Sequence, residues 1–328
     1  MSLLEIDGVD MSFRQGSSVV QACRDVHLTV GHGEVVGLVG ESGSGKSTLA
    51  NLVLGLLTPD QGEIRFDGRP LGSWLEDGRR YRAAVQAVFQ QPMSALDRRR
   101  TIGWSIAEPL VIHRIGDRHS RAGKVAELLH QVGLEPGLAG RLPREMSGGQ
   151  LQRVNIARAL ALKPRLLVCD EPVSALDVSV QAQILNLFLD IQERSGTAML
   201  FVAHDLAVVR HLADRIAVMY AGRIVENGPP EELCSAPLHP YTRALIAASP
   251  DVDGSEEPLP LQPREGLPDH GCRFAPRCPH VEDACREQVP PLRELAPERT
   301  VACLRAEDVQ AGRVSRRSTE SSADETVA

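Results

Sequence analysis

The stretch Val35-Val-Gly-Leu-Val39-Gly40-Glu-Ser-Gly-Ser-Gly45-Lys46-Ser47-Thr48 decides the fold. An apolar run of strand length leads into a glycine-rich loop, and the residues from Leu49 to Leu57 have a helical pattern. Gly40-x-x-x-x-Gly45-Lys46-Ser47 satisfies the P-loop pattern in the strand, loop and helix setting that its mechanism needs. Such a loop cradles phosphate oxygens with its backbone N–H groups, helped by the helix dipole. A chance glycine-rich turn is the alternative.

Each residue type in this loop suits a nucleotide. Lys46 can place a compact ammonium between the β- and γ-phosphates, and Ser47 can offer its hydroxyl to Mg²⁺. We therefore predict an ATP site made by Gly40, Glu41, Ser42, Gly43, Ser44, Gly45, Lys46, Ser47 and Thr48.

Composition narrows the class of protein. The chain has 328 residues, 42% of them hydrophobic and 24% charged, with a formal net charge of -7. These values suit a soluble globular protein with a real core and argue against fibrous, disordered and membrane-spanning chains. There is no long Lys/Arg block, so nucleic acid is not an expected partner. Without a signal-peptide pattern or an apolar run of ~20 residues, the sequence predicts a cytoplasmic protein.

The pattern along the chain predicts an α/β core. Leu166–Asp170 and Ala198–Ala203 are further candidates for buried strands, with an amphipathic helix between them from Val178 to about Arg194 that ends at Gly196. Alternation of this kind indicates a parallel sheet covered by helices. Before the P-loop, residues 1–34 are expected to form short strands with turns, around Leu3–Ile6 and Val26–Val30.

Two other regions have a different texture. The stretch from about 95 to 152 lacks strong strand signals and is predicted to be a helical insertion. Residues 229–305 are rich in proline, which favours a loop-rich appendage over further sheet. The tail 306–328 is polar, with few large apolar groups, and is expected to be disordered.

Two more motifs carry chemistry. Asp170-Glu171 ends an apolar strand at the carboxyl edge of the sheet, where open α/β proteins bind ligands. Asp170 could hold Mg²⁺ and Glu171 could polarise an attacking water, unless the pair only starts a solvated loop. Ser147-Gly148-Gly149-Gln150 precedes a helix and could bind an anion at its N-terminus, or simply cap it.

Together these residues resemble the ATP-binding cassette (ABC) ATPases. The P-loop, Ser147 to Gln150, Asp170-Glu171, Ser174-Ala-Leu-Asp177 and His204 occur in the order and spacing of that family, over residues 1–230. The resemblance implies a P-loop ABC ATPase core with an N-terminal antiparallel β subdomain, a helical subdomain and a small C-terminal extension. It also implies a head-to-tail dimer, in which each ATP is covered by the Ser147–Gln150 segment of a second subunit.

The resemblance also implies individual roles. Glu171, His204 and Gln90 would be catalytic; Asp177 would lie at the dimer interface; Mg²⁺ would be held by Ser47, Gln90 and Asp170. Phe13 matches the aromatic residue that stacks on adenine, although an ordinary core phenylalanine is nearly as good an explanation. Both a homodimer and pairing with a related ATPase are compatible with these residues.

Three segments resemble the oligopeptide/dipeptide importer branch, which also includes ATPases for nickel and other small solutes. They are Phe89–Leu96, Asp177–Gln183 and Pro237-Leu-His-Pro-Tyr-Thr-Arg-Ala-Leu245. The resemblance implies two permease subunits and an external solute-binding protein as partners, with the chain peripheral at the cytoplasmic face of the plasma membrane. The chain departs from the branch at Gln91 and Asp97-Arg98, in the segment expected to touch the permease.

Four of the seven cysteines are crowded into the appendage, as Cys272-x5-Cys278-x6-Cys285-x17-Cys303. Their spacing matches neither zinc ribbons nor bacterial ferredoxins, but a metal centre would staple a segment too poor in apolar residues for its own core. The segment Gly271–His280 resembles the importer region in which four cysteines hold a [4Fe-4S] cluster. Zinc, with His280 as an alternative ligand, and free thiols stay open. Arg273, Arg277 and Arg286 are expected to offset the anionic charge of a cluster.

The sequence thus predicts an ATPase of residues 1–230 that powers the import of dipeptides or oligopeptides through a separate permease, and a four-cysteine extension at 231–305. The alternatives are the same role for nickel or another small solute, or a soluble ABC ATPase with a redox-responsive C-terminal module.

Overall fold

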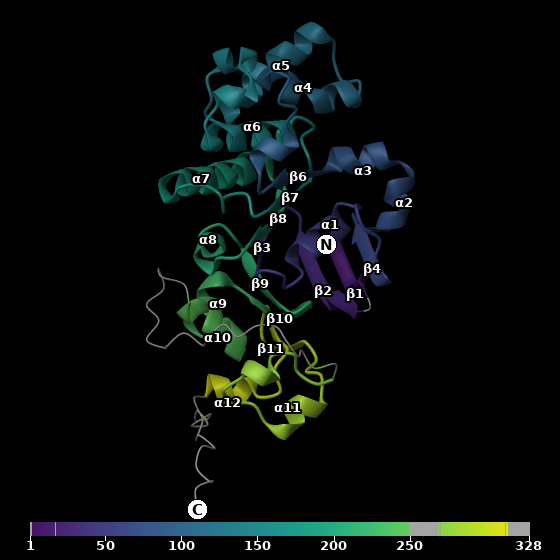
Figure 1. Cartoon of the computed structure of the whole chain (residues 1–328), viewed down its shortest axis with the longest axis vertical. Coiled ribbons are helices and arrows are strands. Elements are labelled where there is room, and N and C mark those ends of the chain that lie inside the picture. Colours follow the sequence, from purple (N-terminus) through teal and green to yellow (C-terminus); the bar gives the residue numbers. More distant parts are fainter. Residues whose placement is uncertain (1, 17, 249–267, 269, 312, 314–328) are drawn as a thin grey trace, which may run out of the picture.

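The computed structural model describes residues 2–16, 18–248, 268, 270–311 and 313. Its main sheet has eight strands in the order β11-β12-β10-β9-β3-β8-β7-β6 (Figure 1). They are β3 (Val35–Val39), β6 (Val85–Phe89), β7 (Leu166–Asp170), β8 (Ala198–Ala203), β9 (Arg215–Tyr220), β10 (Arg223–Gly228), β11 (Arg293–Ala296) and β12 (Arg299–Val301). The predicted strands β3, β7 and β8 are confirmed at both ends, and pair in parallel with β3 beside β8 and β8 beside β7.

A second, antiparallel sheet has the order β2-β1-β4-β5. Its strands are β1 (Ser2–Gln15), β2 (Ser18–Gly31), β4 (Gln61–Phe66) and β5 (Arg69–Pro70). The first two are much longer than the short strands that the sequence predicts. They form one hairpin whose pairing shifts register at several points, and such irregularities hide a long strand from a search for regular alternation.

Helices cover both sheets. Helix α1 (Lys46–Val53) follows the P-loop, α2 (Leu71–Glu76) packs beside β4, and α3 (Gly78–Ala84) lies between α2 and β6. The predicted helical insertion contains α4 (Ile102–Ile112), α5 (Arg118–Gln131) and α6 (Gly148–Leu160), with the short 3-10 turns η1 (Pro92–Ala95), η2 (Pro136–Gly140) and η3 (Pro143–Glu145). Returning to the sheet, the chain forms α7 (Val178–Ser195), α8 (Leu206–Arg210), α9 (Pro230–Ser235) and α10 (Pro240–Ala247). The predicted helix between β7 and β8 is confirmed, with Gly196 in the left-handed conformation at its end.

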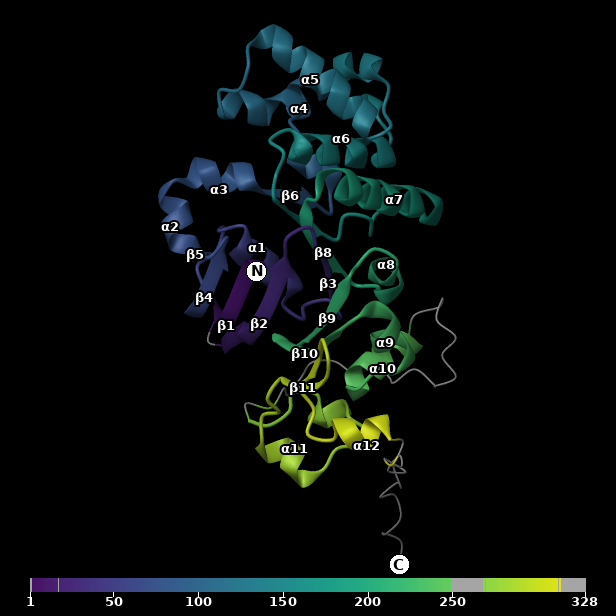
Figure 2. The ribbon, with the colours of Figure 1, turned by 180° about the vertical axis from the view of Figure 1, so that it is seen from behind.

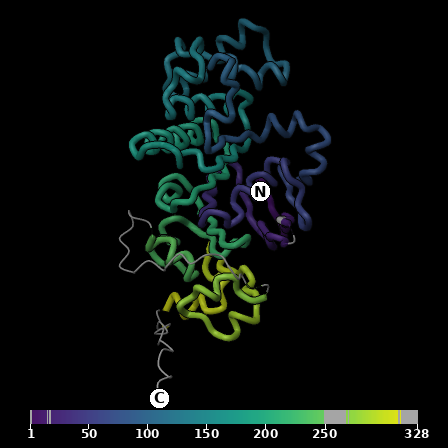
Figure 3. The backbone as a smooth tube through the Cα atoms, viewed as in Figure 1, coloured from purple at the N-terminus to yellow at the C-terminus, as the bar shows by residue number. Residues whose placement is uncertain are grey.

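The molecule is elongated, with the helices α4 to α6 at one end and residues 270–311 at the other (Figures 1 and 3). The view from behind places α2 and α3 on the side of the molecule away from α7 (Figure 2). The far end holds η4 (Ala275–Arg277), α11 (Asp283–Glu287), β11, β12 and α12 (Ala306–Gln310).

Two expectations for this end are wrong. The extension adds β11 and β12 to the main sheet, because β12 pairs antiparallel with β10 along Glu226 and Asn227. A free strand edge can recruit even a short segment, whatever its proline content. The first residues of the predicted disordered tail form α12, where Ala306 and Val309 are fully buried. Residues 312 and 314–328 lie outside the described part of the chain.

Two hydrophobic cores lie on opposite faces of the main sheet. One packs the antiparallel sheet and α1 against alternate residues of β3, β7 and β8, such as Val36, Val168 and Leu200. The other packs α4 to α8 against the remaining face and continues to Tyr241 and Phe274. The cysteine-bearing end therefore shares the core of the cassette and does not build a large one of its own.

Candidate functional site

At two positions, Gly40 and Gly45, the P-loop has a backbone conformation that requires glycine. Gly40 and Gly45 have φ of 154° and 110°, and a Cβ on either would lie 2.1 Å from a backbone oxygen, of Met219 and Ala22 respectively. Helix α1 begins directly after Gly45 with no side-chain cap on its N-terminus. An uncapped helix start behind a closely wrapped loop is the geometry that binds phosphate.

Side chains for the phosphates and for a cation converge here. The Nζ of Lys46 donates to the carbonyl oxygens of Gly40 (2.7 Å) and Glu41 (3.0 Å), so the ammonium lies inside the loop. The Ser47 hydroxyl donates to Asp170 Oδ1 at 3.1 Å, across the gap between α1 and the end of β7. Burial raises the pKa of Asp170, which favours a counter-ion beside it. A hydroxyl and a carboxylate are oxygen donors of the kind that Mg²⁺ prefers, so these residues fit the ion.

Glu171 lies at the meeting point of three segments. Its Oε2 accepts from Gln90 Nε2 at 3.2 Å, just after β6, and lies 3.5 Å from His204 Nδ1, just after β8. Its backbone has a φ of 48°, in the left-handed region, and its N–H donates to Val202 O. Side chains at the carboxyl ends of neighbouring parallel strands converge at one edge of the sheet, and a strained backbone there is typical of functional residues. The three residues predicted to be catalytic are thus together.

The Ser147–Gln150 segment begins α6. Ser147 is exposed, its hydroxyl accepts from Gln150 N at 3.3 Å, and Gln150 Oε1 accepts from Ser147 N at 3.0 Å. This is the capping box of the plain structural alternative. A cap and an exposed anion site are compatible, so the ATP-binding role of this segment stays a prediction.

Asp177 and Phe13 are both at the surface. Asp177 is exposed and precedes α7 without a side-chain cap hydrogen bond. Phe13 is 38% exposed and pairs across the β1 and β2 hairpin with Val20. The core alternative for Phe13 is therefore wrong, while its contact with adenine stays a prediction.

The sequence did not predict that the P-loop would contact the cysteine-bearing extension. The backbone N–H of Glu41 donates to the hydroxyl of buried Tyr241 at 2.8 Å, and the Glu41 carboxylate accepts two bonds from Arg277, of 3.0 and 3.1 Å. Tyr241 belongs to the Pro237–Leu245 segment that resembles the importer branch. That resemblance was the only feature of the sequence that pointed to Tyr241. Arg277 carried no signal of this contact.

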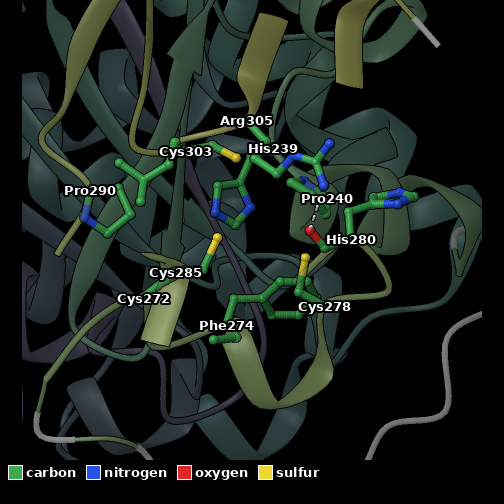
Figure 4. Close-up of a pocket in the computed structure, with 12 residues that line it drawn as sticks. His239, Pro240, Cys272, Phe274, Cys278, His280, Cys285, Pro290, Cys303 and Arg305 are labelled. Atoms are coloured by element: carbon green, nitrogen blue, oxygen red, sulfur yellow. Dashed lines mark hydrogen bonds between the residues drawn. The ribbon is translucent and has the colours of Figure 1, made fainter. Parts of the chain in front are cut away.

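All four late cysteines line one pocket, the cysteine pocket, together with His239, Phe274, His280 and Arg305 (Figure 4). Burial, with a smaller contribution from the neighbouring thiols, raises the pKa of Cys278 to about 12 and of Cys303 to about 11. Over the described residues, no three His, Cys, Asp or Glu side chains converge closely enough to hold a single metal ion. Burial also lowers the pKa of His239 to about 3, so its imidazole is neutral.

The arginines are not arranged as expected. Arg277 faces Glu41, and Arg273 donates to the carbonyl of Ala221 and to Gln21. Arg286 is exposed, and the arginine that lines the pocket is Arg305. Oxygen atoms of the cassette hold the guanidinium groups of Arg273 and Arg277, and neither residue lines the pocket, so their expected role in offsetting the charge of a cluster stays a prediction.

The other cysteines lie apart from this pocket. Cys23, Cys169 and Cys234 are buried, as expected of small apolar side chains.

Two family models match the chain. The model described as ABC transporter covers residues 23–174, and the one described as oligopeptide/dipeptide transporter, C-terminal region, covers residues 225–285. A probable peptide ABC transporter ATP-binding protein of Sinorhizobium fredii is 49% identical over 89% of this chain and 84% of its own length. The chain belongs to the ATP-binding proteins of the oligopeptide/dipeptide ABC transporter family.

Other relatives agree with this assignment. A di/tripeptide transport ATP-binding protein of Pseudomonas aeruginosa is 45% identical over 89% of this chain and 92% of its own. Among solved structures, a dimeric ATP-binding cassette in a post-hydrolysis state with ADP and phosphate has a TM-score of 0.64 and 31% identity, over 69% of this chain and 98% of that one. The ABC ATPase fold and ATPase activity follow for this member of the family, with ATP and Mg²⁺ as the nucleotide and ion that the site fits.

No helix in the described ranges has both the length and the apolar character needed to cross a membrane.

Proposed function

We propose that this ABC ATPase powers the import of dipeptides or oligopeptides through a separate membrane permease. The observation that carries the proposal is the match of residues 225–285 to the C-terminal region of oligopeptide/dipeptide transporters, beyond the cassette that all ABC proteins share. Relatives that align over about nine tenths of the chain are named as ATP-binding proteins of peptide transport or peptide import, which favours peptides over nickel and other solutes. The protein then sits peripherally at the cytoplasmic face of the plasma membrane.

The matches also support a division of the chain. Residues 1–230 form the nucleotide-binding domain, with a helical subdomain at about 95–152, and residues 231–305 form the importer extension. The partners are a second ATPase subunit, identical or related, two permease subunits, and an external solute-binding protein that acts indirectly.

The site residues have defined tasks in this proposal. The P-loop backbone and Lys46 bind the phosphates, while Ser47, Asp170 and Gln90 hold Mg²⁺, which neutralises phosphate charge when bound. Glu171 orients water for in-line attack and His204 contacts the γ-phosphate. Each ATP is covered by the segment equivalent to Ser147–Gln150 of the second subunit, so closure and reopening of the dimer can drive the permease.

The test uses cells that produce the chain together with the permease that co-purifies with it. The cells are supplied with labelled dipeptide, and its uptake is measured. Glu171→Gln should lower ATP turnover by ~10²-fold or more and abolish uptake, because the water loses its base. Glu193→Gln, which neutralises an exposed carboxylate on α7, is the matched control and should keep both activities. Wild-type turnover in Glu171→Gln would contradict the catalytic assignment. Normal turnover in the wild type without any dipeptide uptake would contradict the substrate class.

The cysteine pocket is proposed to hold a [4Fe-4S] cluster through Cys272, Cys278, Cys285 and Cys303. Four thiols that line one pocket match the number and type of ligands that an iron-sulfur cluster takes. The iron ions of a cluster would also supply the positive charge that buried thiolates need, given their raised pKa values. Anaerobically purified protein should then be brown and contain iron and acid-labile sulfide. Colourless protein that contains zinc, or no metal, would contradict the assignment.

A further inference from the structure

The P-loop and the cysteine pocket are joined by a short chain of contacts. Glu41 is the second residue of the P-loop, and its side chain and backbone N–H are both held by the extension, through Arg277 and Tyr241. The two bonds from Arg277 are parallel and bidentate, the geometry that fixes a carboxylate most firmly. The side chain of Arg277 is only 10% exposed, which limits screening by solvent.

Arg277 is itself fixed by the walls of the cysteine pocket. It lies in the 3-10 turn η4, between Cys272 and Cys278, and its neighbour Cys278 lines the pocket. The turn is closed by bonds from Ala275 N to Cys272 O and from Arg277 N to Phe274 O. Whatever holds the two thiols therefore also sets where the Arg277 backbone lies.

Aromatic rings complete the link. Phe274 lines the pocket and packs edge-on against Tyr220, with centroids 5.3 Å apart, and against Tyr241 at 5.6 Å. The Arg277 guanidinium lies 5.7 Å from the Tyr220 ring centroid and 5.6 Å from that of Phe274. Close-packed interiors transmit strain, so we expect a change in the pocket to reach the Arg277 side chain and the Tyr241 hydroxyl through these rings.

We infer that Arg277 is a positioning residue for the P-loop, which makes the affinity for ATP depend on the state of the cysteine pocket. With the thiols held, Arg277 and Tyr241 keep Glu41 and the start of the phosphate cradle in place. When the thiols are released or modified, the turn loosens and the cradle loses two of its supports. By linkage, ATP must protect the pocket by the same factor with which the held pocket favours ATP.

The inference rests on the proposed function in one respect: it takes the proposed cluster as the group that holds the thiols of the pocket. The first experiment measures the dissociation constant of a fluorescent ATP analogue for the whole chain, before and after iron is stripped with a chelator and oxidant. We expect stripping to weaken binding by about tenfold, within the range of ~5- to 150-fold typical of coupled sites. Arg277→Gln should weaken binding in the iron-loaded protein by a similar factor, and stripping should then add less than about twofold, because contacts in one network are not additive.

Three further variants define the cause. Glu41→Gln removes the same ion pair from the other side, so the double variant with Arg277→Gln should bind no more weakly than either single variant. Arg277→Lys keeps the charge without the fork and should restore part of the affinity. Arg286→Gln removes an exposed arginine from the same segment and should behave as wild type. Circular dichroism and thermal unfolding identify variants that fail to fold. If the Arg277 variants fail to fold, the affinity of Glu41→Gln for the nucleotide tests the inference.

A second experiment separates this inference from the cluster. N-ethylmaleimide labelling of Cys272 and Cys278 in metal-free protein, followed by mass spectrometry, should be slowed by ATP with Mg²⁺ in wild type and unaffected by nucleotide in Arg277→Gln. Protein without iron that still shows this protection supports the coupling while the cluster proposal fails. Equal labelling rates with and without nucleotide in wild type, or a full additional loss on stripping in Arg277→Gln, would overturn the inference.

Discussion

At the scale of single residues, backbone conformation rather than side-chain chemistry builds the phosphate site. Gly40 and Gly45 allow the loop to pass within contact of Met219 and Ala22, and the ammonium of Lys46 then lies inside the loop. The strained backbone of Glu171 likewise places its carboxylate between Gln90 and His204. The residue types were readable from the sequence, but these distances depend on the convergence of three strand ends.

Gly45→Ala provides a test at this scale. The new Cβ would clash with the Ala22 carbonyl and force a positive φ on alanine, so we expect the free energy of unfolding to fall by about 1–3 kcal/mol and ATP binding to be lost. Gly123→Ala is the control, because a Cβ there meets nothing within 4 Å inside α5, and helix propensity should raise stability by ~0.5–1 kcal/mol. Urea unfolding and nucleotide titration measure both effects. Full nucleotide affinity in Gly45→Ala would contradict this account of the loop.

At the scale of elements, strands and helices with a regular apolar pattern were predictable from the sequence. Elements that form only by pairing with a distant segment were not. Strand β7 and helix α7 follow clear apolar patterns within one segment. Strand β12 has three residues and exists because the edge of β10 is open to it, a condition that no local pattern carries. Fully buried Glu226 on β10 accepts from Leu238 N, His239 N and Arg299, and so holds the extension against this edge.

Cys278→Ser tests the extension as an element. If metal binding supplies its folding energy, the variant should lose the brown colour and iron of anaerobic protein. Residues 270–311 should become sensitive to protease. The free energy of unfolding should fall by more than ~3 kcal/mol, which exceeds the usual effect of one substitution. Cys234→Ser, at a buried cysteine outside the pocket, should keep the colour. Unchanged colour and protease resistance in Cys278→Ser would show that this thiol is not a structural ligand.

At the scale of the whole molecule, the Ser147–Gln150 segment begins α6, next to the helices at one end of the cassette, while the extension at the opposite end holds Glu41 of the P-loop (Figure 1). An exposed capping box has its own structural purpose, yet its two glycines leave the helix start open to an approaching molecule. In the function proposed above, a second cassette occupies this helix start and completes the site.

Ser147→Arg tests that assembly. A long charged side chain at the helix start should block closure, so the double variant with Glu171→Gln should stay monomeric with ATP, whereas Glu171→Gln alone should dimerise. Affinity of the monomer for ATP should change less than about twofold, because the P-loop is untouched. The lost cap should cost ~0.5–2 kcal/mol. Thr101→Arg removes the cap of α4 and controls for that cost. Light scattering reads the mass, and an ATP-dependent dimer of the double variant would refute the composite site.

The sequence by itself determined the family and the α/β core, and it identified the residues of the candidate ATP site and the four late cysteines, because each depends on residue types at short, regular spacing. Only the tertiary structure decided that the extension joins the main sheet, that the four cysteines share one pocket, and that Arg277 and Tyr241 hold the P-loop. Glu41 and Arg277 are separated by 236 positions along the chain. Contacts of that kind arise when distant segments pack on a common core, so no local sequence pattern predicts them.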